Sequence, residues 1–158
     1  MFRHTANYES LIAWHNITSP HKAAVDEHAI PHAVYTYPTV AAVGLTQAEA
    51  QSNGFKILVG YNRYSNVAKG NAMATEGLVK VVLDKATYKI LGASIAGPEA
   101  DTMIQSITYL MNCGDETYNP LARSQTIHPS LREVLIGAFA QLVDPEELLA
   151  RNQNATTH

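Results

Sequence analysis

The chain of 158 residues has little cysteine and little charge. A single cysteine, Cys113, excludes an internal disulfide and a cysteine-based zinc site. The net charge of −3 provides no basic surface for a phosphate backbone, so we expect no nucleic-acid partner. No apolar run approaches the roughly 20 residues that a membrane span needs. The first residues, Met1 to His4, form no apolar signal segment, so we expect a cytoplasmic protein without a membrane partner.

Apolar residues are plentiful by comparison. They make up 46% of the chain, which is enough to fill a core, whereas charged residues make up only 16%. A globular domain usually carries roughly 25% charged residues. The low charge suggests that part of the surface is covered by another chain or domain, so we expect an oligomer.

Local patterns divide the chain into three expected parts. Residues 1–29 should hold a short helix over residues 6–17 and a linker, and residues 145–158 a frayed polar tail. Residues 30–144 should form the compact domain. Within it we expect extended structure over residues 30–44, a capped helix from Thr46 to the Asn53-Gly54 pair, and strands over residues 55–64, 78–83 and 90–96. Residues 65–76 are expected to form a loop.

Two further helices are expected in the C-terminal half. The first follows Gly97-Pro98 with an apolar stripe of Ala100, Met103, Ile104, Ile107, Leu110 and Met111. The second should run from about Ser130 to Val143, after an irregular segment over residues 115–127. The sum predicts an α+β fold, with a mainly antiparallel sheet and helices packed on one side. No glycine-rich loop follows a strand, so no Rossmann unit is expected.

His128 and Glu133 are the most promising candidates for chemistry. A carboxylate that holds one imidazole nitrogen fixes the tautomer and suits a general acid/base, and a proline turn could bring the two side chains together. The segment Ser130 to Glu133 also fits a capping box, in which Glu133 would only cap the helix. The spacing alone leaves both interpretations open.

Other reactive side chains have plainer explanations. His21, His28 and His32 could share a metal ion if they lay on a helix, but Pro31 argues against a helix there, and we expect no metal site. Cys113, next to the apolar helix, is expected to be a small core residue rather than a nucleophile.

Several motifs together resemble one known family. They are IPHAVYTYP at residues 30–38, VAAVGLT at residues 40–46, the Ile90 to Ala93 and Gly97-Pro98 segments, and His128-Pro129-Ser130 with Glu133. Their order resembles the C-terminal dimerisation domain of FAD-dependent pyridine nucleotide–disulfide oxidoreductases, such as dihydrolipoamide dehydrogenase and mycothione reductase. Residues 1–17 resemble the end of that family's FAD domain. The FAD-domain and NAD-domain motifs and the redox-active cysteine pair of the family are not found here, and Cys113 does not match that pair.

The resemblance implies a role for each candidate residue. His128 would be the acid/base that serves the partner subunit's redox disulfide, and Glu133 would orient it. Pro129 would hold the turn through a cis peptide, and His128 and Pro129 would lie beside the partner's flavin. His4, Thr5 and Ala6, at the start of the first helix, would face a flavin with their backbone N–H groups.

The resemblance also implies cofactors and partners. The full-length enzyme would use FAD and NAD(P), act on a disulfide or dithiol substrate, and form a homodimer with a role in cell redox homeostasis. We expect the isolated chain to be inactive and to bind neither FAD nor NAD tightly. We expect its dimer interface on the helices after Gly97 and Ser130, including a face of Met103, Ile107 and Met111. The alternatives are a stand-alone, non-catalytic dimerisation module and, less favoured, an unrelated ligand-binding domain. The identity of the disulfide substrate stays open.

Overall fold

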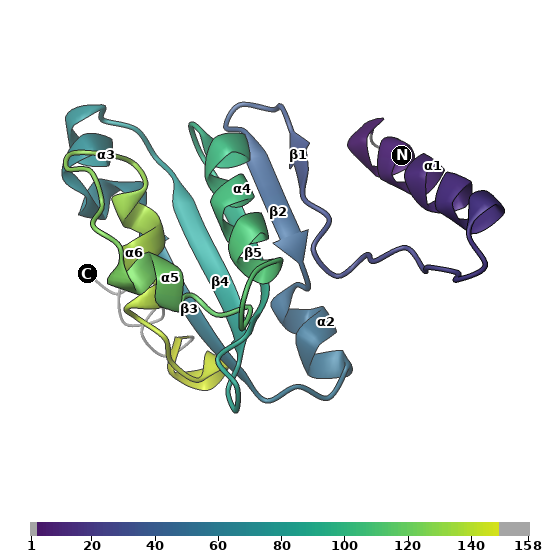
Figure 1. Ribbon diagram of the computed structural model, residues 1–158. Coiled ribbons are helices and arrows are strands. Elements are labelled where there is room, and N and C mark those ends of the chain that lie inside the picture. Colours follow the sequence, from purple (N-terminus) through teal and green to yellow (C-terminus); the bar gives the residue numbers. More distant parts are fainter. Residues whose placement is uncertain (1–2, 149–158) are drawn as a thin grey trace.

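The computed structural model describes residues 3–148 (Figure 1). Within that range it contains one antiparallel sheet of five strands in the order β1-β2-β5-β4-β3. The strand bounds are β1 His32–Val34, β2 Val40–Gly44, β3 Ile57–Arg63, β4 Leu78–Asp84 and β5 Ile90–Ala96. The predicted α+β class and the predicted strands are confirmed.

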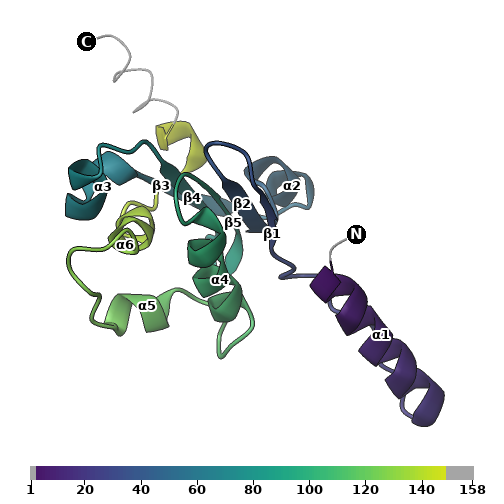
Figure 2. The same cartoon turned by 90° about the horizontal axis from the view of Figure 1, so that it is seen from above.

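Helices surround the sheet, apart from the first one, which projects away from it. Their bounds are α1 Arg3–Thr18, α2 Gln47–Ser52, α3 Ala68–Ala72, α4 Ala100–Met111, α5 Asn119–Arg123 and α6 Glu133–Phe139, with a 3₁₀ turn, η1, at Tyr64–Asn66. In both ribbon views α1 stands clear of the sheet, and none of its residues is buried (Figures 1 and 2). None of the helices within residues 3–148 is long and apolar enough to cross a membrane.

The main core lies between one face of the sheet and helices α4 and α6. Every residue of the predicted apolar stripe of α4 is buried there. Met103 and Ile107 have no exposed surface, and Met111 is only 2% exposed. The expectation that these three residues form a dimer face is therefore wrong, because the chain's own sheet already covers them.

A smaller cluster covers the opposite face of β3. It consists of Ala50, Ile57, Val59, Val82, Val143 and Leu148. Val143 and Val59 exchange two backbone hydrogen bonds of 2.9 Å, so Val143 is extended rather than helical. Helix α6 therefore ends at Phe139, earlier than its apolar periodicity predicts. Residues 145–148 are helical and Leu148 is buried, so the expected polar tail begins later than residue 145; the rest of that tail lies outside the described residues.

The capping box before α2 forms as predicted. Glu49 N–H donates to Thr46 Oγ1 at 3.2 Å, and Thr46 N–H donates to Glu49 Oε2 at 2.8 Å. Gly54 follows the helix with a φ of +83°, a conformation that glycine adopts without strain. Both signals are local, which is why the sequence alone reveals them.

The expected loop over residues 65–76 is partly wrong, because η1 and α3 form there. Tyr64 is fully buried, and its hydroxyl donates to the Pro98 carbonyl oxygen at 2.9 Å. A Cβ on Gly70 would overlap the Tyr64 carbonyl oxygen, so α3 packs directly on the backbone of Tyr64. The expected irregular segment over residues 115–127 likewise contains the short helix α5.

Candidate functional site

His128 and Glu133 meet where the segment after α5 enters α6. The His128–Pro129 peptide bond is cis, and Glu133 is the first residue of α6. The apolar face of α6, which includes Val134, Leu135 and Ala138, is buried against the sheet. This packing fixes the helix whose first residue carries the carboxylate.

The Glu133 carboxylate satisfies both interpretations of the sequence at once. Its Oε1 lies 2.8 Å from His128 Nδ1, and its Oε2 accepts a hydrogen bond of 2.9 Å from the Ser130 backbone N–H. Sequence reasoning assigned Ser130 a capping side chain, but its Oγ is buried without a hydrogen-bond partner among the described residues. Of the predicted capping box, only the half in which the Ser130 backbone N–H donates to Glu133 is formed.

The hydrogen bonds hold Glu133 in its charged form. The bond from His128, followed by that from the Ser130 N–H, lowers the pKa of the Glu133 carboxyl below its ordinary value. An ionised carboxylate only accepts hydrogen bonds, so the Nδ1 of His128 carries a proton and, in the neutral ring, Nε2 is free to accept one. The His128 side chain is 68% exposed, whereas that of Glu133 is 25% exposed. The pair thus presents an oriented imidazole to its surroundings.

The second predicted site lies at the start of α1. His4, Thr5 and Ala6 are in the first turn of this helix, and that first turn contains no acidic residue. With Arg3 and Tyr8, His4 and Thr5 also line a hollow of about 820 Å³ that extends to α4. The N–H groups of the first turn and the Arg3 cation suit an electron-rich or anionic group, whereas Asp26 and Asp101 also line the same hollow. The donor set therefore fits one edge of a flavin, but the described residues offer no glycine-rich loop for its phosphates.

The two predicted sites are not brought together by one chain. Helix α1 and helix α6 lie at opposite ends of the molecule in both ribbon views (Figures 1 and 2). A ligand at the first turn of α1 is therefore remote from His128 of the same chain.

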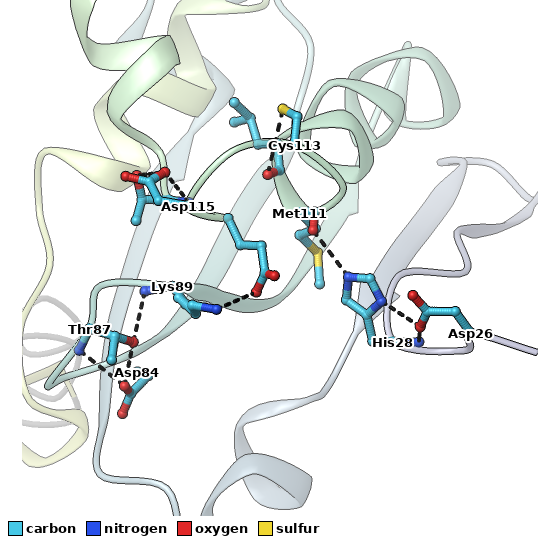
Figure 3. A network of polar contacts seen from close by, with 11 residues as sticks. Asp26, His28, Asp84, Thr87, Lys89, Met111, Cys113 and Asp115 are labelled. Atoms are coloured by element: carbon cyan, nitrogen blue, oxygen red, sulfur yellow. Dashed lines mark hydrogen bonds and ion pairs between the residues drawn. The ribbon is translucent and has the colours of Figure 1, made fainter. Parts of the chain in front are cut away.

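The remaining candidates have other environments. Among residues 3–148 no group of three or more potential ligands could hold a metal ion. His28 instead lies between Asp26 and the C-terminal end of α4, 2.6 Å from Asp26 Oδ1 and 3.1 Å from the Met111 carbonyl oxygen (Figure 3). Cys113 is exposed, so the expectation that it is a core residue is wrong. It follows the last turn of α4, outside the apolar stripe.

Comparisons with known proteins agree with this architecture. The family model described as "Pyridine nucleotide-disulphide oxidoreductase, dimerisation domain" matches residues 30–139. Mycothione reductase from Mycobacterium tuberculosis is 36% identical over 149 residues, which is 90% of this chain and 32% of the relative. Dihydrolipoyl dehydrogenase from Haloferax volcanii is 34% identical over 141 residues, covering 87% of this chain and 29% of the relative.

A solved structure shows the same fold. An HOCl-induced flavoprotein disulfide reductase from Escherichia coli superposes with a TM-score of 0.76 at 25% identity, over 89% of this chain and 32% of that one. The chain thus spans about a third of the length of the relatives it matches. Because the family model covers most of the chain, the chain belongs to the pyridine nucleotide-disulphide oxidoreductases, as their dimerisation domain.

Proposed function

We propose that this chain is the dimerisation portion of a flavin-dependent disulfide oxidoreductase, and that it supplies His128 and Glu133 to the partner subunit's active site. One observation carries the proposal. An exposed imidazole, held by an ionised carboxylate, lies at the end of the molecule opposite α1. Such an imidazole is placed to serve a reacting group of another subunit.

The chemistry follows from the two side chains. His128 Nε2 takes the proton of a substrate thiol as that sulfur attacks the partner's redox disulfide, which forms a mixed disulfide and releases one cysteine as thiolate. The second substrate thiol then attacks the mixed disulfide, so that the substrate leaves as a disulfide, the partner's cysteine pair is reduced, and His128 returns a proton to it; the reverse sequence reduces a disulfide substrate. Glu133 keeps the proton of the ring on Nδ1 and stabilises the imidazolium that forms. His128 and Pro129 lie beside the flavin of the partner, and NAD(P) is the second redox partner of the complete enzyme.

The start of α1 serves the other half of the site. FAD, when bound, supplies the two-electron transfer. His4, Thr5 and Ala6 orient one edge of its ring through the N–H groups of the helix end. Because α1 and α6 are at opposite ends, each flavin meets the His128 of the other subunit. The proposal thereby accounts for self-association, which the family's dimerisation domain implies.

A chimera tests the proposal without requiring any further sequence. Residues 30–144 replace the corresponding domain of the mycobacterial mycothione reductase, which retains its own nucleotide-binding parts. We expect a flavin-loaded dimer that reduces its disulfide substrate, and His128→Gln should lower turnover by about 10²–10⁴-fold with flavin content unchanged. The control substitution must lie within the transferred segment, which excludes His21. Lys85→Gln, on the exposed hairpin inside that segment, is therefore the matched control.

The alternative is a dimerisation module without a catalytic role. In that case the chimera would still dimerise and bind flavin, but turnover would be the same with and without His128. Wild-type turnover of the His128→Gln chimera would therefore contradict the acid/base assignment.

A further inference from the structure

We propose that Asn62, on strand β3, is the positioning residue that sets the register of α6 and thereby holds Glu133 against His128. The inference rests on the proposed function of this pair and extends it to a residue that touches neither side chain. Asn62 is 4% exposed, one of few buried polar side chains among the described residues.

Asn62 connects three elements through hydrogen bonds. Its Nδ2 donates to the Val134 carbonyl oxygen in the first turn of α6 at 3.3 Å. Its Oδ1 accepts from the Asn66 side-chain amide at 2.8 Å and from the Arg63 backbone N–H at 3.0 Å. The donor and acceptor ends of the side chain are thus both used. The asparagine cannot rotate to free its amide without losing bonds at both ends.

The helix is shaped to receive this side chain. Gly137 lies one turn after Val134, on the same face of α6, and a Cβ at Gly137 would overlap the Asn62 amide nitrogen. On the strand, a Cβ at Gly60 would overlap the Ala138 carbonyl oxygen. The two glycines let helix and strand approach closely, and the asparagine fills the remaining space.

A directional bond to the sheet is needed because the other contacts of α6 with the sheet are apolar packing. Val134, Leu135, Ala138 and Phe139 bury apolar surface, and such contacts tolerate a small slide or rotation of the helix. A buried hydrogen bond to one carbonyl fixes the register more narrowly. Glu133 precedes Val134 directly, so a shift at Val134 moves the carboxylate relative to His128, which belongs to the preceding loop.

The test replaces the amide by an isosteric apolar side chain in this chain. In Asn62→Leu, NMR titration should place the Glu133 carboxyl pKa closer to the ordinary value of about 4.3, and the His128 Nδ1 proton signal should weaken or broaden. Thr108→Val is the matched control, because it removes one buried side-chain hydrogen bond, of 3.1 Å to the Ile104 carbonyl oxygen, on α4. The control should leave both signals of the pair unchanged.

A second variant keeps the proposal testable if Asn62→Leu does not fold. Gly137→Ala retains Asn62 but places a methyl group where its amide lies, and should give the same two NMR changes. In the chimera, either variant should lower kcat by about 10-fold to 100-fold, with KM for the nicotinamide cofactor unchanged. Unchanged Glu133 and His128 signals in a folded Asn62→Leu protein would overturn the proposal, as would equal changes in Thr108→Val.

These results separate the two proposals. If His128→Gln leaves turnover intact while Asn62→Leu alters the NMR signals of the pair, the catalytic role falls and the positioning role stands. If His128→Gln abolishes turnover while Asn62→Leu changes neither signal, only the positioning role falls.

Discussion

Glu133 accepts hydrogen bonds from His128 and from the Ser130 backbone N–H on separate carboxylate oxygens. Replacing one oxygen therefore distinguishes the role of each bond. In Glu133→Gln the remaining oxygen can keep the Ser130 N–H, while the new amide would donate to His128 Nδ1 and push the ring proton to Nε2. We expect the chimera to lose turnover, though less than with His128→Gln, and ¹⁵N NMR should show the reversed tautomer. Near-normal turnover would mean that Glu133 only caps the helix.

Tyr64 provides a test of the fold at the same scale. Its hydroxyl reaches the Pro98 carbonyl oxygen from a fully buried ring, and burial raises its pKa. Tyr64→Phe should lower the free energy of unfolding by about 1 kcal/mol, the usual net value of such a bond. Urea unfolding measures the change. Tyr35→Phe, at an exposed position, should leave the unfolding midpoint in place, and an equal loss there would contradict the assignment.

At the scale of elements, the linker after α1 is attached to the end of α4 through His28. Both of its partners, the Asp26 carboxylate and the Met111 carbonyl, are acceptors, so both bonds form together only when the ring carries two protons (Figure 3). The bond to Asp26 first, then the bond to the Met111 carbonyl, and the nearby charges of Asp26 and Glu116 raise the pKa of His28. The attachment is therefore complete below about pH 6.5, the value for an unfolded histidine, and is lost as the pH rises through the raised pKa.

Amide exchange measures this pH dependence. The His28 backbone N–H, which donates to Asp26 Oδ1 at 3.1 Å, should lose protection as the pH rises above about 6.5 through the raised pKa, after correction for the intrinsic rate. His28→Gln should remove the pH dependence, whereas the control His21→Gln should keep it. Constant protection of the wild-type chain across this range would show that the second proton is not required.

The same scale shows what the sequence could and could not predict. Helix α2 was predictable because Thr46, Glu49 and Gly54 are local signals. Helix α3 was not, because it depends on Gly70 packing against Tyr64 and on Tyr64 reaching Pro98. The apolar periodicity predicted too late an end for α6, because the apolar side chain of Val143 packs in the smaller cluster on the opposite face of β3 rather than on the helix.

The candidate site, like the fold, was predictable only where its contacts are local in the sequence. A spacing of five residues around a proline turn was enough to predict that His128 and Glu133 could meet. Asn62 lies 72 residues before Val134 in the sequence, so its contact with α6 has no local signature. The bond from the Ser130 backbone N–H to Glu133 was predictable from the capping-box pattern, whereas the burial of Ser130 Oγ without a partner among the described residues was not.

At the scale of the whole molecule, the exposed apolar surface near His128 predicts where the partner lies. Ile127 is 81% exposed and directly precedes His128. If His128 acts in the partner's site, Ile127 lies at the interface, and Ile127→Glu should weaken the dimer of this chain by at least about tenfold. Light scattering across a dilution series measures the change. Ile17→Glu, at a 78% exposed position on α1, is the control, and equal dimer strength in both variants would contradict this placement.

Because α1 and α6 lie far apart, each chain contributes its α1 to one site of the dimer and its His128 to the other site. Two versions of a longer chimera, which transfers residues 3–144 and so includes α1, one with His128→Gln and one with Thr5→Glu at the flavin-facing turn, should each be inactive. Mixed and reassembled, they should regain about a quarter of wild-type activity, because half of the dimers are mixed and one of the two sites in each is free of both changes. The defects are thus recessive to each other in a mixed population, as complementing alleles of one gene are.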